Sequence, residues 1–200
     1  MSRMGVVPRL ATREDAPFLA ELWGDVMRRV DRSEQVADLE LVIKQAAASP
    51  EERIVVVEYD GRPAGAVFLR LDTMSPLNLE PVVQSIHPRV LDDFRRHGVG
   101  RTLMEAAATF AEENGVLHVA TAVMSSSRDA NRFMARLGLA PVATYRAAPT
   151  TLLRSRVSPP RAGADRGGHM RVLAARRSRR ARAVDDQVVL PERRDPIAPE

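Results

Sequence analysis

Two β-rich runs joined by a short turn restrict the fold of this chain most strongly. Residues 53–59 and 64–71 are dominated by Val, Ile, Leu, Phe and Ala, and Asp60-Gly61 stands between them. Both turn residues readily adopt a positive φ angle, which is typical of a tight hairpin. The sequence therefore predicts two consecutive antiparallel strands.

Helical spacing predicts two helices before this hairpin. Apolar side chains recur at helical intervals over residues 18–30 after a cap at Thr12, and again from a cap at Ser33 to a stop before Pro50. The other elements expected are strands at 6–9, 79–87, 116–123 and 140–147, and helices at 98–114 and 126–138. Hairpin-linked strands alternating with helical crossovers predict a mixed α/β (α+β) sheet with helices on both faces.

Charge is distributed unevenly along the 200 residues. The formal net charge is +4 and the pI is about 10.4, which would suit a polyanionic partner. Residues 1–150, however, carry 18 basic against 20 acidic side chains, whereas residues 151–200 carry 12 against 6. Linker-like composition begins at Ser158. We therefore expect one domain over residues 1–156 and a disordered Pro/Gly/Arg-rich tail over residues 157–200.

The tail suggests its own hypothesis. Six arginines between Arg171 and Arg182 could neutralise phosphates of a nucleic acid or another polyanion. Residues 157–200 contain no aromatic side chain for stacking on bases, which makes a solvated extension the better interpretation. Nucleic acid is therefore an unfavoured partner, and only of the tail.

Composition excludes several classes of chemistry. The chain has no Cys, and its four His lack metal-ligand spacing, so we expect neither a disulfide scaffold nor a metal site. No apolar run approaches the ~18 residues of a membrane-spanning helix. The sequence predicts a cytoplasmic protein without a membrane partner.

One turn carries the chemical signal. Arg95-Arg96-His97-Gly98-Val99-Gly100 lies between an expected strand and an expected helix. Its two glycines leave backbone N–H groups uncovered at the positive end of a helix dipole, where a phosphate binds well. A dinucleotide fingerprint would need Gly at position 103, where Leu103 stands, and a P-loop would need Gly-Lys-Ser/Thr. We therefore expect an anion site of another kind.

This turn resembles the Q/R-x-x-G-x-G/A acyl-CoA pyrophosphate loop of the GCN5-related N-acetyltransferase (GNAT) superfamily. Residues 127–139 are similar to that family's late helix and its Leu-Gly-Phe-like turn, and residues 60–65 to its hairpin between the second and third strands. The resemblance covers roughly residues 5–148. It implies a GNAT-like, mostly antiparallel sheet and transfer of an acetyl or other acyl group from acetyl-CoA or another acyl-CoA to an amine.

The resemblance also implies a cofactor site. Backbone N–H groups from Arg96 to Arg101 would hold the pyrophosphate, and the strand end at 85–88 would pair with the pantetheine arm. The full set that the resemblance assigns to the cofactor is Arg95, Arg96, His97, Gly98, Val99, Gly100, Arg101, Ser127 and Asn131. Ser127 has an alternative role as a helix cap, and Asn131 faces either cofactor or solvent.

Catalysis needs a group that accepts the proton of the amine. Glu80 stands where many family members carry a general base, and His87 competes for that role; a solvated carboxylate and a CoA contact are their alternatives. The family's usual Tyr, which protonates the thiolate, is replaced by Met134, which cannot donate a proton. Water or Tyr145 would then serve.

That substitution keeps a second function open. A noncatalytic acyl-CoA-binding or sensor module would need the cofactor site but no residue that protonates the thiolate. Pairing of final strands between subunits is common in the resembled family, so a homodimer is also considered.

Overall fold

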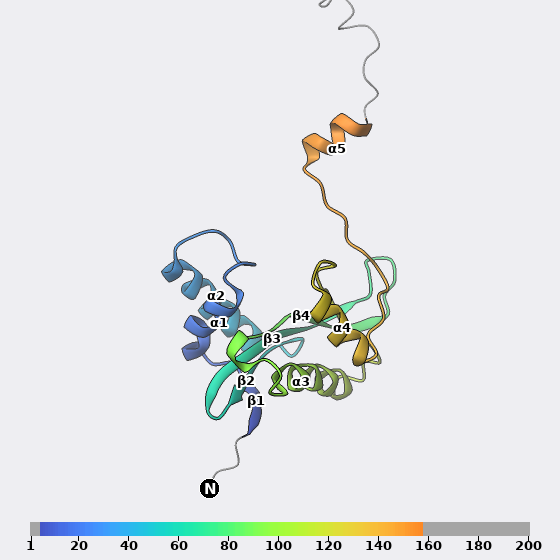
Figure 1. Ribbon diagram of the computed structural model, residues 1–200. Coiled ribbons are helices and arrows are strands. Elements are labelled where there is room, and N and C mark those ends of the chain that lie inside the picture. Colours follow the sequence, from blue (N-terminus) through green and yellow to red (C-terminus); the bar gives the residue numbers. More distant parts are fainter. Residues whose placement is uncertain (1–4, 158–200) are drawn as a thin grey trace, which may run out of the picture. The chain divides into compact units, whose positions relative to one another are not determined.

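The computed structural model describes residues 5–157 of the chain, and a five-stranded sheet organises the first compact unit (Figure 1). The strands are β1 (Val6–Leu10), β2 (Glu52–Tyr59), β3 (Arg62–Thr73), β4 (Pro81–Val90) and β5 (Val119–Thr121), and they lie in this order across the sheet. The first four pair antiparallel, and β5 pairs parallel with β4. The predicted mixed, mostly antiparallel sheet is confirmed. The predicted Arg-rich tail lies outside the described residues.

The hairpin between β2 and β3 forms where the sequence places it. Tyr59 pairs with Arg62, and the two residues between them have positive φ, 51° at Asp60 and 74° at Gly61. Positive φ at both central positions is the geometry whose twist matches that of flanking strands. The turn residues therefore set the register of the two central strands.

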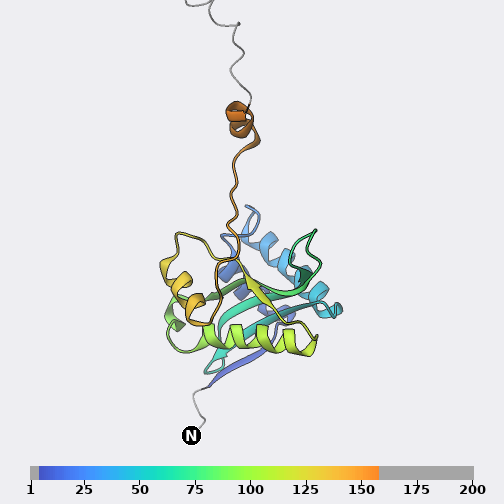
Figure 2. The same ribbon diagram turned by 90° about the vertical axis from the view of Figure 1, so that its right-hand side faces the viewer.

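Helices cover both faces of the sheet (Figures 1 and 2). Helices α1 (Ala16–Trp23) and α2 (Arg32–Ala48) pack on Ile54 and Val56, whereas α3 (Val99–Glu113) packs on Val55 and Val57. Alternate residues of one strand point to opposite faces. The continuous apolar run of β2 thus serves two hydrophobic cores, and the predicted helices on both faces are confirmed.

The first helix is shorter than the spacing of its apolar residues predicts. It ends at Trp23 instead of continuing to residue 30, and Val26 beyond it is 43% exposed. At Gly24, the residue after the helix, a Cβ atom would lie 2.8 Å from the Ala20 carbonyl oxygen, so a larger residue would require a local shift. The second helix is capped by Asp31, whose carboxylate accepts the Glu34 N–H, and not by Ser33.

One predicted strand is longer than the strand that forms, and the prediction of another strand is wrong. The expected strand over 116–123 is reduced to the three residues of β5, and residues 140–147 form no strand. A strand needs a neighbour for its backbone hydrogen bonds, and none of the described residues pairs with this run. Val142 and Tyr145 are instead 83% and 94% exposed.

The described part of the chain divides into two compact units after Pro141. Residues 5–141 form one compact unit that includes the sheet, the short 3₁₀ turns Arg13–Asp15 and Asp92–Phe94, and α4 (Arg128–Arg136). Residues 142–157 belong to a second unit with α5 (Thr150–Val157), a helix that the sequence analysis did not predict. No helix between residues 5 and 157 is long and apolar enough to cross a membrane.

Candidate active site

The turn before α3 presents a run of unused backbone donors. Gly98 has a φ of 87° and Arg96 a φ of 65°, and the first helical hydrogen bond is donated by the Thr102 N–H to the Gly98 carbonyl. Within residues 5–157, no acceptor takes the six consecutive N–H groups from Arg96 to Arg101. Unpaired N–H groups at a helix N-terminus, preceded by left-handed residues, form a concave anion site. We call residues 95–101 the glycine turn.

Charged side chains around the glycine turn remain in solvent. Arg95 forms an ion pair with Asp92 at 2.7 Å, yet its side chain is 67% exposed, and Arg96 and Arg101 are also exposed. The His97 ring packs edge-on against Tyr59, with ring centroids 4.9 Å apart. The glycine turn thus offers backbone donors at its centre, exposed guanidinium groups around it, and a histidine that anchors it to β2.

One of two glycines near the start of α3 sets the position of the helix that carries these donors. At Gly65 in β3 a Cβ would lie 2.6 Å from the Arg89 carbonyl oxygen and 2.9 Å from Val99 Cγ1, so only glycine lets the start of α3 rest on the strand. At Gly100 a Cβ would meet Phe133 of α4 at an ordinary 3.5 Å. The first of these glycines is therefore required by packing, whereas the second is not.

Strands β4 and β5 separate beyond a short paired region. Their pairing ends at Ser85 and Thr121, where the Thr121 hydroxyl donates to the Ser85 carbonyl at 2.9 Å. Beyond Ser85, β4 pairs with β3 alone, through Ile86, Arg89 and Val90. An extended chain could occupy the open side, because the backbone groups of this edge lack a strand partner. From this edge β4 runs on to Val90, five residues before the glycine turn begins at Arg95.

A β-bulge lies on this open edge. Ala66 pairs with Arg89 and Phe68 with Ile86, so that His87 and Pro88 together stand opposite Val67. His87 adopts a φ of 46°, and its carbonyl oxygen accepts a hydrogen bond from the Trp23 indole Nε1–H at 2.9 Å. We call His87 and Pro88 the bulge.

An ion pair holds the strand just after the bulge. The Arg89 guanidinium donates to the Leu22 carbonyl at 3.3 Å and to both carboxylate oxygens of Asp25. The guanidinium of Arg89 lowers the pKa of the Asp25 carboxyl. The end of α1 is thereby fixed to β4 beside the opening.

The two predicted candidates for the general base are well separated. Glu80 lies just before β4, half exposed, with its carboxylate 3.2 Å from Nδ1 of His118. His87 lies seven residues further along, at the bulge, with its side chain exposed. At about 3.3 Å per strand residue, these two positions are roughly 20 Å apart. One reacting centre cannot contact both.

The predicted site residues on α4 serve a local turn. Asn131 Nδ2 donates to the carbonyls of Met124 and Ser127, at 3.0 and 2.7 Å. Ser127 stands at the cap position, and its side chain makes no capping hydrogen bond. Met134, at the position of the family's usual Tyr, is 8% exposed and forms part of the buried face of α4.

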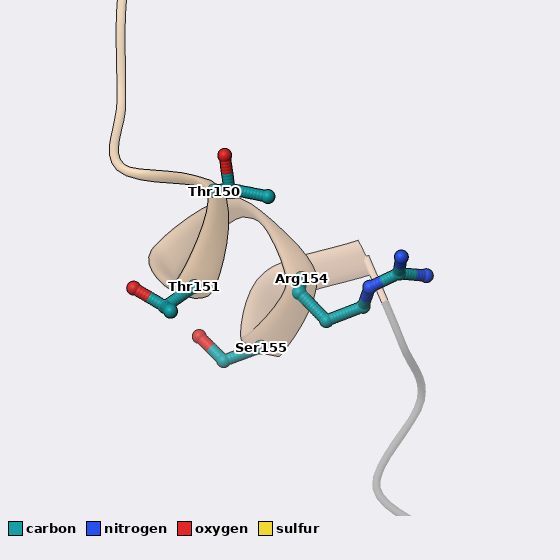
Figure 3. A pocket seen from close by; sticks show the side chains of 4 residues that line it. All are labelled: Thr150, Thr151, Arg154 and Ser155. Atoms are coloured by element: carbon teal, nitrogen blue, oxygen red, sulfur yellow. The ribbon is translucent and has the colours of Figure 1, made fainter.

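The remaining predicted residue, Tyr145, belongs to the second unit, and its side chain is 94% exposed. That unit also holds a shallow hollow lined by four side chains of one helix, Thr150, Thr151, Arg154 and Ser155 (Figure 3). All four are exposed, and none is a predicted site residue. Across the described residues, no group of three His, Asp or Glu side chains is arranged to hold a metal ion.

Sequence reasoning did not find three of the contacts around β4. Trp23 looked like one apolar position of a helix, Arg89 and Asp25 are separated by 64 residues, and His118 fell inside the strand expected over 116–123. Each acts through a partner far away in the chain. No local pattern could have identified them.

The sequence resemblance implies an acyl-CoA pyrophosphate loop at the position where the structure has this donor-rich helix N-terminus. The model of the acetyltransferase (GNAT) family matches residues 16–139, more than half of the chain. The chain therefore belongs to the acetyltransferase (GNAT) family and is a GNAT-type acyltransferase. A search of curated proteins found no match.

Solved structures show the same fold at low sequence identity. A transcriptional regulator from Bacillus halodurans C-125 is 18% identical, with a TM-score of 0.62 over 72% of this chain and 99% of that chain. Glucosamine-6-phosphate N-acetyltransferase from Arabidopsis thaliana is 16% identical, with a TM-score of 0.57 over 73% and 99%. An aminoglycoside N-acetyltransferase in complex with CoA is 18% identical, with a TM-score of 0.58 over 74% and 99%.

Proposed function

We propose that this protein is an N-acetyltransferase that transfers an acetyl group from acetyl-CoA to an amine. The observation that carries the proposal is the run of six unpaired N–H groups from Arg96 to Arg101. A pyrophosphate supplies acceptor oxygens for such a run and gains from the helix dipole. A structurally similar aminoglycoside N-acetyltransferase was solved with CoA, which supports the same cosubstrate here.

The open edge of β4 provides a path for the rest of the cosubstrate. From the glycine turn, a pantetheine arm would extend along residues 86–90, where amide-bearing chain can pair with unpartnered backbone. Its thioester would then lie near the point where β4 and β5 meet, close to Ser85 and the bulge. Helix α3 closes one face of the sheet there, since Met104 contacts Ser85. The amine would approach from the opposite face.

The reaction needs one proton acceptor and one proton donor. The neutral amine attacks the thioester carbonyl carbon, a C–N bond forms, the C–S bond breaks, and the CoA thiolate leaves. His87 lies in β4 beyond its pairing with β5, next to the path proposed for the thioester, so we propose that its imidazole takes the amine proton, directly or through a water. Water protonates the thiolate, because buried Met134 has no proton to give. Glu80, paired with His118, is the competing candidate for the base, and Tyr145 is the competing candidate for the proton donor.

The alternative is a noncatalytic acyl-CoA sensor, favoured by Met134 alone. An assay for free CoA separates the two functions. The protein is mixed with acetyl-CoA and a panel of amines, from aminoglycosides to amino sugars and peptide N-termini. A catalyst releases CoA with at least one amine. Confirmed acetyl-CoA binding without any release would leave the sensor.

Matched substitutions then assign the base. His87→Gln should lower kcat by about 100-fold or more if the imidazole is the base, because general bases contribute ~10²–10⁴-fold. Glu80→Gln should leave kcat within about twofold, since the two positions are far apart along β4. Both variants should bind acetyl-CoA normally. The opposite ranking would assign the base to Glu80, and a collapse of turnover in either variant would exclude the sensor.

We propose the domain boundary at residue 156 and a cytoplasmic location on sequence grounds. On the same grounds we propose that two copies of the chain pair, and that any contact with a polyanion is confined to the Arg-rich tail. The identity of the amine is decided by the panel.

A further inference from the structure

The backbone of the bulge is held in an unfavourable conformation. His87 has a φ of 46°, although it carries a Cβ, and left-handed φ costs a non-glycine residue roughly 1–2 kcal/mol. Such strain persists only where surrounding structure imposes it. The neighbouring Pro88 has no N–H, so no backbone hydrogen bond donated at that position can hold the bulge. The restraint must come from other contacts.

Trp23 supplies that restraint from the last turn of α1. Its indole N–H donates to the His87 carbonyl at 2.9 Å, and its side chain is almost fully buried, with 6% exposure. Two residues later, Arg89 is fixed to the Leu22 carbonyl and to Asp25. Both sides of the bulge are therefore attached to the same end of α1, and the buried indole fixes the direction of the peptide that carries His87.

The bulge lies where the proposed reaction takes place. It begins two residues beyond Ser85, the last residue of β4 that pairs with β5, and it precedes the glycine turn. A shift of the His87 peptide would move both the imidazole and the edge along which the thioester passes. Misplacement by about 1 Å can cost ~100-fold in rate.

We propose that Trp23 is a positioning residue for acyl transfer: the hydrogen bond from its indole to the His87 carbonyl holds the bulge in the conformation that the reaction uses. The inference rests on the proposed function, because it assumes that the thioester passes the bulge. The hydrophobic cluster in which Trp23 packs contains no residue of the glycine turn or of α3. Trp23 acts through His87.

The test compares Trp23→Phe, which keeps an aromatic ring and removes the N–H, with Ile43→Val. Ile43 is 5% exposed and belongs to the same hydrophobic cluster as Trp23, so its variant controls for lost packing. Trp23→Phe should lower kcat by about 10- to 100-fold. The Kd for acetyl-CoA should stay within about twofold, because the glycine turn is untouched. Ile43→Val should lower Tm and leave kcat unchanged.

Three outcomes are distinguishable. A Trp23→Phe enzyme with wild-type kcat and a lowered Tm would overturn the positioning role and leave the acetyltransferase proposal standing. A wild-type protein that binds acetyl-CoA and acetylates no amine would refute the proposed function itself. A crystal structure of Trp23→Phe adds a readout independent of turnover: relaxation of His87 to negative φ supports the inference, and an unchanged bulge refutes it.

Discussion

The glycine turn before α3 and the segment after Pro141 both carried clear sequence signals, yet only the first folds as expected. The turn depends on a few neighbouring residues, two of which, Arg96 and Gly98, adopt left-handed φ. The segment at 140–147 is equally rich in strand-forming residues, but a strand exists only with a partner. Adjacent residues alone determine a local backbone motif, whereas a strand forms only where the rest of the sheet supplies a pairing partner.

The largest expected effect concerns the support of the glycine turn. Gly65→Ala should lower the free energy of unfolding by about 1–3 kcal/mol, because its Cβ would overlap the Arg89 carbonyl and Val99. Gly100→Ala is the matched control: its Cβ fits, and alanine is favoured in a helix by ~1 kcal/mol. Urea unfolding measures both. Equal stability of the two variants would mean that α3 does not rest on β3 as described.

A second substitution tests the conformation of the turn itself. Gly98→Ala imposes a strain of roughly 1–2 kcal/mol at a φ of 87°, and we expect an acetyl-CoA affinity about tenfold weaker. Gly98→Asn should retain more affinity, since Asn tolerates left-handed φ. Isothermal titration of acetyl-CoA compares the two. Equal affinity of Gly98→Ala, Gly98→Asn and the wild-type protein for acetyl-CoA would contradict this prediction.

A smaller effect is expected from the exposed charges beside the turn. Arg96→Gln should weaken acetyl-CoA binding by about two- to fivefold at low salt, and this difference should shrink near 1 M salt, where the Debye length is ~3 Å. Arg101→Gln should behave similarly. A salt-independent loss of more than tenfold would show that side chains, and not backbone N–H groups, hold the anion.

The smallest effect is expected in the segment that did not form a strand. Val142→Ser and Tyr145→Ser change exposed side chains and should alter the free energy of unfolding by less than about 0.5 kcal/mol. Val83→Ser in β4, where the side chain is fully buried, should cost at least ~1.5 kcal/mol. A comparable cost at Val142 would reveal a packed strand at 140–147 and remove the contrast between the two regions.

The same contrast explains what the sequence could predict. The hairpin at Asp60-Gly61, the helix after Gly98 and the two-sided strand β2 follow from local turn chemistry and hydrophobic periodicity. The end of α1 at Trp23 and the bulge at His87 do not, because a hydrogen bond across 64 residues links them. The left-handed turn at Arg96 and Gly98 follows from its glycine-rich sequence, whereas the order of the catalytic candidates along β4 required the register of the sheet.

The central claim is that the glycine turn binds the pyrophosphate of the cosubstrate. Titration with acetyl-CoA and with S-acetylpantetheine, which has the same thioester and lacks the pyrophosphate and nucleotide, tests it most directly. The account predicts measurable acetyl-CoA binding and an affinity for the truncated donor weaker by at least about 100-fold, equivalent to ~2.7 kcal/mol. Equal affinity for the two donors would contradict it.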